Sequence, residues 1–187
     1  MVNERLKWLA GIGFVLALTV VVLGAWTRLV DAGLGCPDWP GCYGFIAVPQ
    51  TAVDIATAQA RFPDVPVEAH KAWPEMVHRY FATTLGLVIV ITAVYAWMKR
   101  SPGTPVGLLC VLVVLVIVQG AFGAWTVTLK LWPQVVTAHL LGGFATLSLL
   151  WLLLLRLGVG AQWRVPRTVK NLAIAALAVG VGQISLG

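Results

Sequence analysis

The chain has 187 residues, of which 59% are hydrophobic and only 11% are charged, and its mean hydropathy is +0.89. This composition excludes an ordinary soluble domain and is typical of an integral membrane protein. The net charge is +6, but this excess gives no support for a nucleic-acid partner. The positive-inside rule explains it, because most of the basic residues are expected on one side of the membrane.

The first uncharged run extends from Trp8 to Trp26 and is long enough to cross a bilayer as a helix. Residues 24–28, which close the run, read GAWTR and contain no small-x-small cleavage site for a signal peptidase. We therefore interpret this run as a retained transmembrane helix and not as a signal peptide.

A long loop, residues 27–73, follows and contains the segment 35–42 with the sequence GCPDWPGC. Its two cysteines predict a disulfide in an oxidising compartment, and a structural role for this disulfide is favoured over a redox role. A zinc site is less favoured, because zinc sites usually combine more ligands. Further along, Thr51 and Asp54 form a start that resembles a capping box, so the alanine-rich segment 51–62 predicts a short helix at the membrane surface.

The second apolar run, Tyr80 to Met98, is preceded by the segment 73–79 with the sequence WPEMVHR. Proline is favoured at the first helical position, so Pro74 predicts the start of this helix. Glu75 and His78 lie three residues apart, so the sequence places an acid and an imidazole on one face at the mouth of an apolar helix.

The third and fourth apolar runs, Val106 to Leu129 and Val135 to Leu155, repeat this pattern. The third run contains GAWT at 123–126, as the first does at 24–27, and the segment 132–139 that leads into the fourth run reads WPQVVTAH. The sequence therefore predicts an internal repeat of two helix pairs.

A fifth apolar run, residues 171–187, reaches the end of the chain. We expect residues 1–156 to form a four-helix transmembrane bundle, and residues 157–187 to form a cytoplasmic loop and the truncated beginning of a fifth transmembrane helix. The basic loop is expected to extend over residues 156–170. Cys110, in the middle of the third run, is predicted to be a small buried residue.

Basic residues set the orientation of these helices, since eight of the 13 belong to one side under alternating topology. That side is predicted to be cytoplasmic and to hold the N-terminus, which makes the loop 27–73 periplasmic. The eight residues are Arg5, Lys7, Lys99, Arg100, Arg156, Arg164, Arg167 and Lys170.

His78 and His139 occupy equivalent positions of the repeat. Each lies within two turns of the proline expected to begin its helix, Pro74 or Pro133, so their depths in the membrane differ by only about 3 Å. An intramembrane histidine is usually functional, and an interhelical hydrogen bond is the alternative. Two imidazoles at matched depth predict a shared ligand, and haem fits an apolar slot between helices. Covalent c-type attachment is excluded, because the chain has no Cys-x-x-Cys-His.

Three charged residues are expected at the same outer level as the histidines. Glu75 is either a proton donor or acceptor at the mouth of an apolar cavity, or a first-turn acid favoured by the helix dipole. Arg28 and Arg79 are candidate haem-binding residues, which can pair with haem propionates or with lipid phosphates. The spacing does not choose between these alternatives.

Three segments together resemble the haem A synthase family: residues 24–29 (GAWTRL), 33–42 (GLGCPDWPGC) and 75–79 (EMVHR). His139, in its setting in the fourth helix, matches the family's second ligand position in the first bundle. The resemblance extends over the first four helices, and the combination of segments is specific.

The resemblance implies an eight-helix protein of two similar four-helix bundles, each with a histidine pair, of which this chain would hold the N-terminal bundle. It implies oxidation of a methyl group of haem O to the formyl group of haem A for terminal oxidases, with a haem b in the second bundle. On this chain it implies that His78 and His139 are ligands of haem iron, that Glu75 is catalytic, and that Cys36 and Cys42 are the outer-loop pair found in many bacterial members.

The expected partners are the haem O substrate, the lipid bilayer, the haem O synthase and oxidase assembly factors, and a homo-oligomer is compatible with the sequence. The expected location is the inner (plasma) membrane, which the chain crosses several times. An alternative function is that of a bis-histidine haem electron carrier or a haem-handling assembly factor that does no chemistry on the ring. A membrane thiol oxidoreductase is less favoured, because its Cys-x-x-Cys pair is absent from the sequence.

Overall fold

The computed structural model describes residues 4–159 and 166–186. Within these ranges the secondary structure is helical, with one isolated bridge between Cys42 and Phe45. All helices except α2 are long and apolar enough to cross a membrane, which confirms the predicted all-α membrane fold. The helices are α1 (Glu4–Leu29), α2 (Ala52–Arg61), α3 (Ala69–Met98), α4 (Val106–Thr128), α5 (Pro133–Arg156) and α6 (Arg167–Leu186).

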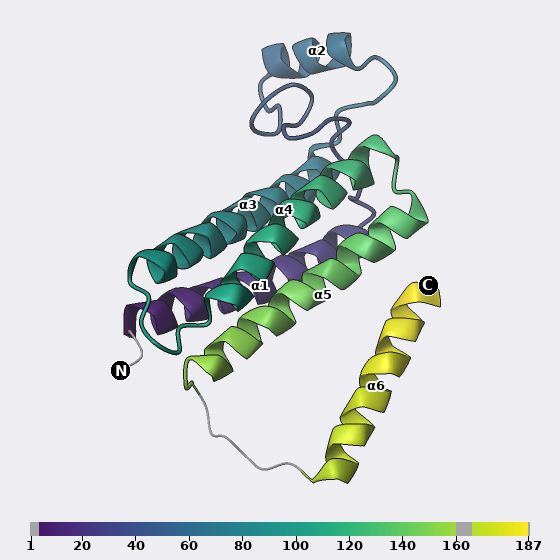
Figure 1. The fold of residues 1–187 in the computed structure, drawn as a ribbon. Coiled ribbons are helices and arrows are strands. Elements are labelled where there is room, and N and C mark those ends of the chain that lie inside the picture. The colour runs from purple at the N-terminus through teal and green to yellow at the C-terminus, as the bar shows by residue number, and fades with distance from the viewer. Residues whose placement is uncertain (1–3, 160–165, 187) are drawn as a thin grey trace.

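Four of these helices form a closed bundle (Figure 1). Helix α1 packs against α3 and α5, and α4 packs against the same two helices, whereas no comparable contact joins α3 with α5 in the described chain. Helices α3 and α5 are therefore diagonal neighbours across the interior. The closely packed apolar core fills the end of the bundle that holds the N-terminus of α1, with Leu6, Leu85, Ile89, Leu109, Leu112, Leu150 and Leu153 at its centre.

The starts of α4 and α5 agree with the sequence, whereas the start of α3 does not. Helices α4 and α5 begin at Val106 and Pro133, as predicted, but α3 begins at Ala69, so the predicted start at Pro74 is wrong. The first turn of α3 is stabilised from outside the helix: the Lys71 ammonium lies 3.2 Å from a carboxylate oxygen of Asp31, at the end of α1. This ion pair joins residues far apart in the chain, so a pattern based on proline alone does not show it.

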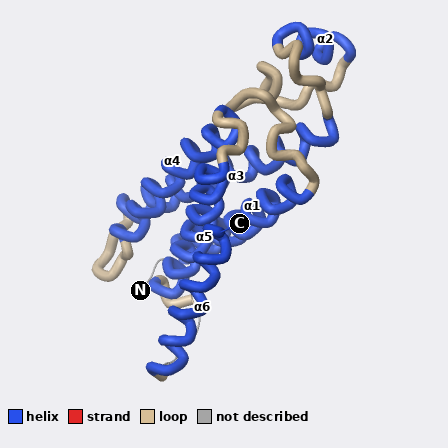
Figure 2. Tube along the Cα trace, turned by 90° about the vertical axis from the view of Figure 1, so that its right-hand side faces the viewer, coloured by secondary structure: helices blue, strands red, loops and turns tan. Residues whose placement is uncertain are grey.

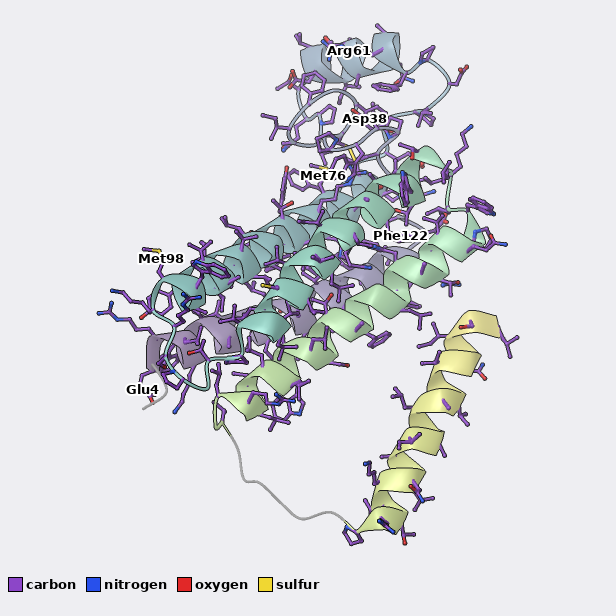
Figure 3. The ribbon with its side chains drawn as sticks, viewed as in Figure 1. Glu4, Asp38, Arg61, Met76, Met98 and Phe122 are labelled. Carbon is purple, nitrogen blue, oxygen red and sulfur yellow. A yellow bond between two sulfur atoms is a disulfide. The ribbon has the colours of Figure 1, made fainter. Side chains whose placement is uncertain are left out.

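The loop between α1 and α3 folds into a cap with its own small core. Its residues Cys36, Cys42, Tyr43, Val48 and Ala58 are buried against the start of α3. The predicted disulfide between Cys36 and Cys42 is present. In Figure 3 the labelled Asp38 and Arg61 lie in this cap, beyond the outer end of the bundle.

Two local features hold the cap in shape. The Asp38 carboxylate accepts hydrogen bonds from the backbone N–H groups of Tyr43 and Gly44, at 2.6 and 2.8 Å. The backbone N–H of Asp54 donates to the Thr51 hydroxyl at 3.1 Å, which makes Thr51 the N-cap of α2 and confirms the predicted short helix. The chain between the two membrane helices is therefore an ordered element and not a simple connection.

The internal repeat is visible where α1 and α4 end. The Thr27 hydroxyl donates to the Gly24 carbonyl at 2.7 Å, and the Thr126 hydroxyl donates to the Gly123 carbonyl at the same distance. The equivalent residues that reverse the chain after the two helices both have positive φ, namely Asp31 (53°) and Lys130 (49°). The repeated GAWT segment therefore gives α1 and α4 the same C-terminal structure.

Helix α6 packs only against α5 among the described helices, and Figure 1 shows it apart from the bundle. In Figure 2, which views the molecule from that side, α6 lies in front of the bundle. It begins at Arg167, so Arg167 and Lys170 lie in its first turn and the basic loop predicted over 156–170 is shorter than expected. Arg164 lies outside the described residues. Cys110 is exposed on α4, which contradicts its predicted burial, because the outward side of α4 faces away from the other helices.

The ends of the helices alternate as the topology prediction requires. The N-terminus of α1, the connection between α3 and α4, and the end of α5 lie at one end of the bundle, and the cap lies at the other (Figure 1). The described basic residues expected on the cytoplasmic side are at the end without the cap. Which end faces the cytoplasm stays a prediction.

Replacing both Cys36 and Cys42 by serine is expected to destabilise the cap by about 2 kcal/mol, because the open chain loses the restraint of a short covalent ring. Limited proteolysis of the oxidised protein in detergent should show faster cleavage within residues 30–68. The control is Cys110→Ser, since Cys110 is free and exposed on α4. Equal cleavage of the double variant and the native chain would contradict a stapling role.

Candidate functional site

The site is built around two histidines with buried ring nitrogens inside the bundle. His78 lies on α3 and His139 on α5, the two diagonally related helices. The structure therefore places both histidines that the repeat relates in the half of the bundle nearer the cap.

Each imidazole lies against a glycine of the repeated GAWT segment. A Cβ atom added to Gly24 would lie 3.0 Å from Cε1 of His78, and one added to Gly123 would lie 3.5 Å from Cε1 of His139. The contact at Gly24 leaves little room for a side chain, whereas the distance at Gly123 is that of an ordinary van der Waals contact. In both cases the ring packs against the neighbouring helix at a glycine. Helices α1 and α4 thus each present an equivalent glycine, against which a histidine ring of another helix packs.

The two rings also present buried nitrogen atoms that nothing satisfies. Within the described chain, Nδ1 of His78 and Nδ1 of His139 are buried without a hydrogen-bond partner. Leaving such an atom unpaired costs about 1–3 kcal/mol, so a buried pair of them points to a missing ligand. Two imidazoles across an apolar interior fit the axial positions of a haem iron, since the porphyrin supplies the remaining ligands.

A bare metal ion fits the site less well. In the part of the chain that the structure describes, no group of three or more His, Cys, Asp or Glu side chains gathers around a common point. Structural and catalytic sites for zinc usually take three or four protein ligands, and two imidazoles alone do not meet that need. The donor set is therefore better suited to an iron that arrives with its own macrocycle.

Glu75 lies one turn from His78 toward the cap, and its side chain is buried, with 6% of its surface exposed. Its Oε2 atom accepts a hydrogen bond from the backbone N–H of Cys36 at 3.0 Å, and its Oε1 atom accepts one from Arg79. Because α3 begins at Ala69, Glu75 is not in the first turn, so its interpretation as a first-turn acid is wrong. The carboxylate joins the cap to the helix that carries His78.

Arg79 completes the connection between α3 and the cap. One of its guanidinium nitrogens donates to Glu75, and the other donates to the backbone carbonyls of Asp38 and Gly41. Arg28, the other predicted basic residue, lies in the last turn of α1 with its side chain exposed. The structure thus gathers Arg79, Glu75 and the disulfide loop at one place and leaves Arg28 at the rim.

Sequence reasoning missed one residue of the interior. Gln119 of α4 has a buried Oε1 atom without a hydrogen-bond partner in the described chain. It lies one turn before Gly123, on the same face of the helix. The available signal was a lone amide in an otherwise apolar run, since a polar residue inside a membrane helix usually faces the bundle interior.

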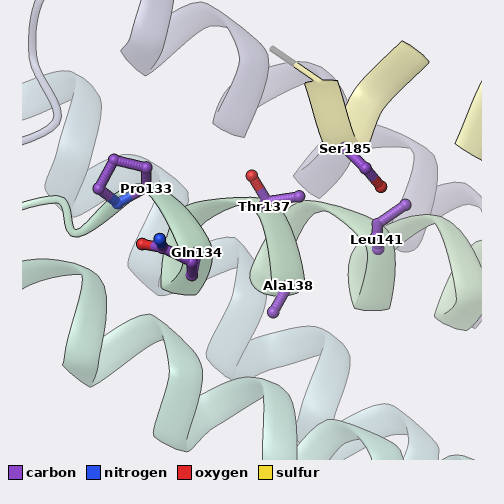
Figure 4. Close-up of a pocket in the computed structure, with 6 residues that line it drawn as sticks. All are labelled: Pro133, Gln134, Thr137, Ala138, Leu141 and Ser185. Atoms are coloured by element: carbon purple, nitrogen blue, oxygen red, sulfur yellow. The ribbon is translucent and has the colours of Figure 1, made fainter. Parts of the chain in front are cut away.

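A surface pocket between α5 and α6 is a separate feature (Figure 4). It has a volume of about 330 Å³ and lies between the first turns of α5 and the end of α6, where Ser185 contributes to its wall. Its other lining residues fall on one face of α5, and the helical periodicity places His139 on the opposite face. The pocket is therefore not the space between the two imidazoles. The lining residues on α5 are Pro133, Gln134, Thr137, Ala138 and Leu141.

Several bacterial proteins named heme A synthase are similar to the chain. One from Shewanella oneidensis is 48% identical over 186 residues, which cover 98% of this chain and 56% of the relative. Those from Mesorhizobium japonicum and Rhizorhabdus wittichii are 31% and 30% identical, over 76% and 99% of this chain and 43% and 59% of their own lengths. The chain thus spans about half the length of the curated relatives that it matches.

No solved structure matches the chain. The family model COX15-CtaA, described as cytochrome oxidase assembly protein, matches residues 7–187, which include the whole helical bundle, the cap and both histidines. The chain therefore belongs to the COX15-CtaA family of cytochrome oxidase assembly proteins.

Proposed function

We propose that this chain provides the substrate-binding bundle of a haem A synthase, an integral membrane enzyme that oxidises a methyl group of haem O to the formyl group of haem A. The observation that carries the proposal is the pair of buried, unpartnered imidazoles, His78 and His139, on diagonal helices. The name shared by the similar bacterial proteins supports the enzyme over a haem carrier that leaves the ring unchanged.

His78 and His139 would hold the haem iron through one ring nitrogen each. The bound haem supplies both the iron that exchanges electrons and the methyl group that is oxidised. Gly24 and Gly123 leave room for the imidazoles beside their helices, so the rings can reach toward the middle of the bundle. The apolar helices around them keep bulk water away from the oxidised position.

Glu75 acts in this proposal as the proton acceptor. With water as the source of the oxygen atom, a methyl group becomes a formyl group by losing four electrons to an external acceptor and four protons, so a base is needed near the ring edge. The Glu75 carboxylate is held by Arg79 and by the backbone N–H of Cys36, within one turn of His78. The cap contacts thus fix the position of the carboxylate, and a proton taken up at Glu75 leaves toward the cap side.

Arg79 and Arg28 have different roles in this proposal. Arg79 is occupied by Glu75 and by cap carbonyls, so it positions the acid, and a haem propionate would have to share it. Arg28 is exposed at the rim of α1 and is the better partner for a propionate.

In this proposal the haem O synthase supplies the substrate, and terminal oxidases receive the product with the help of their assembly factors. The protein lies in the inner membrane, with its cap on the periplasmic side.

The histidine assignment predicts that His78→Ala and His139→Ala each reduce the affinity for protohaem by about tenfold or more, because each removes an axial ligand. Absorption spectra of the purified variants, titrated with protohaem, should lose the low-spin bis-imidazole signature. His70→Ala is the matched control, since this third histidine is exposed at the start of α3. Native-like binding by both single variants would contradict the assignment.

The acid assignment predicts that Glu75→Gln abolishes haem A formation while haem stays bound, because the amide keeps the shape of the side chain and cannot take up a proton. The measurement is mass spectrometry of haems extracted from cells that make haem O and express the protein. Glu68→Gln serves as the control, since Glu68 lies just before α3. Haem A formation at the native level in the Glu75 variant would exclude the catalytic role.

A further inference from the structure

Gln119 of α4 and His139 of α5 each lie against a glycine of the facing helix. A Cβ atom added to Gly142 would overlap the Gln119 amide, so this amide lies directly against the α5 backbone. Gly142 is three residues beyond His139, and Gln119 is four residues before Gly123, against which the His139 ring lies. Since α4 and α5 run in opposite directions, the amide is one helical turn deeper than the imidazole, on the adjoining surface.

Two polar atoms of these side chains lack partners, and they are complementary. The Oε1 atom of Gln119 can only accept a hydrogen bond, and Nδ1 of His139 belongs to a ring that carries at least one N–H. Both atoms are buried and unpaired within the described chain.

We propose that Gln119 is a positioning residue for His139: its Oε1 atom accepts a hydrogen bond from one ring N–H of His139 while the other ring nitrogen binds haem iron. This inference rests on the proposed function, because it requires that His139 is an iron ligand. A histidine that binds a metal almost always donates its second N–H to an oxygen, which fixes the tautomer and the orientation of the ring. The hydrogen bond then satisfies the Gln119 oxygen, and the iron takes the ring nitrogen that the hydrogen bond leaves free.

The other half of the repeat has no counterpart of this amide. Val20 holds the position on α1 that corresponds to Gln119, four residues before the glycine. The proposed hydrogen bond is therefore specific to His139.

The test compares Gln119→Leu and Gln119→Glu in the full chain, purified in detergent and titrated with protohaem. Leucine fills a similar volume but accepts no hydrogen bond, so we expect about tenfold weaker binding of protohaem. We also expect a high-spin component in the ferric spectrum and the appearance of carbon monoxide binding in the ferrous form, since the His139–iron bond opens. Glutamate keeps the acceptor, so that variant should stay low-spin and bind protohaem as the native chain does.

Gln134→Leu is the matched control, because it makes the same change on the α5 face that lines the separate pocket, and its protohaem spectrum should not change. If the native chain binds protohaem through two imidazoles and Gln119→Leu keeps the native affinity and low-spin spectrum, this inference is wrong and the proposed function stands. If the native chain shows no bis-imidazole haem, both fail. A high-spin spectrum in both Gln119 variants, with native helix content by circular dichroism, would also overturn the acceptor role.

Discussion

The close contact of each histidine ring with a glycine backbone is the constraint on which the site depends. A side chain at Gly24 or Gly123 would occupy the space next to an imidazole. Because the two histidines come from diagonal helices, their rings reach the same interior space only if α1 and α4 leave room for them. The packed leucines lie at the other end of the bundle, so the apolar core supports the helices without filling the site.

The cap is part of the site as well as a connection. Its disulfide loop meets α3 through Glu75 and Arg79, and these two residues bind each other. A buried carboxylate next to a guanidinium is costly to separate, since either partner alone would be left with unmet hydrogen bonds. The position of the proposed proton acceptor therefore depends on the fold of the cap, and the Cys36–Cys42 ring keeps that fold compact.

Much of this arrangement follows from short-range patterns that a sequence displays. The apolar runs specify the membrane helices, and the repeated GAWT segments relate His78 to His139. The start of α3 could not be inferred in this way, because the ion pair between Lys71 and Asp31 joins residues far apart in the chain. For the same reason, the contacts of Arg79 with the cap carbonyls are invisible in a linear pattern.

Gln119 shows the limit of sequence reasoning most clearly. The proposed role of its amide depends on Gly142 and His139, which belong to another helix, so the sequence of α4 alone does not reveal it. The exposure of Cys110 could not be predicted either, since the sequence of a uniformly apolar helix does not show which face is turned inward. Helix existence was therefore predictable from composition, whereas the roles of single polar residues required the packing of the helices.

The central claim is that two imidazoles of this chain share one haem iron, and electron–nuclear double resonance on the ferric protein labelled with ¹⁵N-histidine tests it most directly. The account predicts hyperfine couplings from two axial histidine nitrogens on one low-spin iron, and the loss of one of them when His139 is replaced by alanine. A spectrum with a single histidine nitrogen in the native protein, or with both couplings unchanged in the variant, would contradict it.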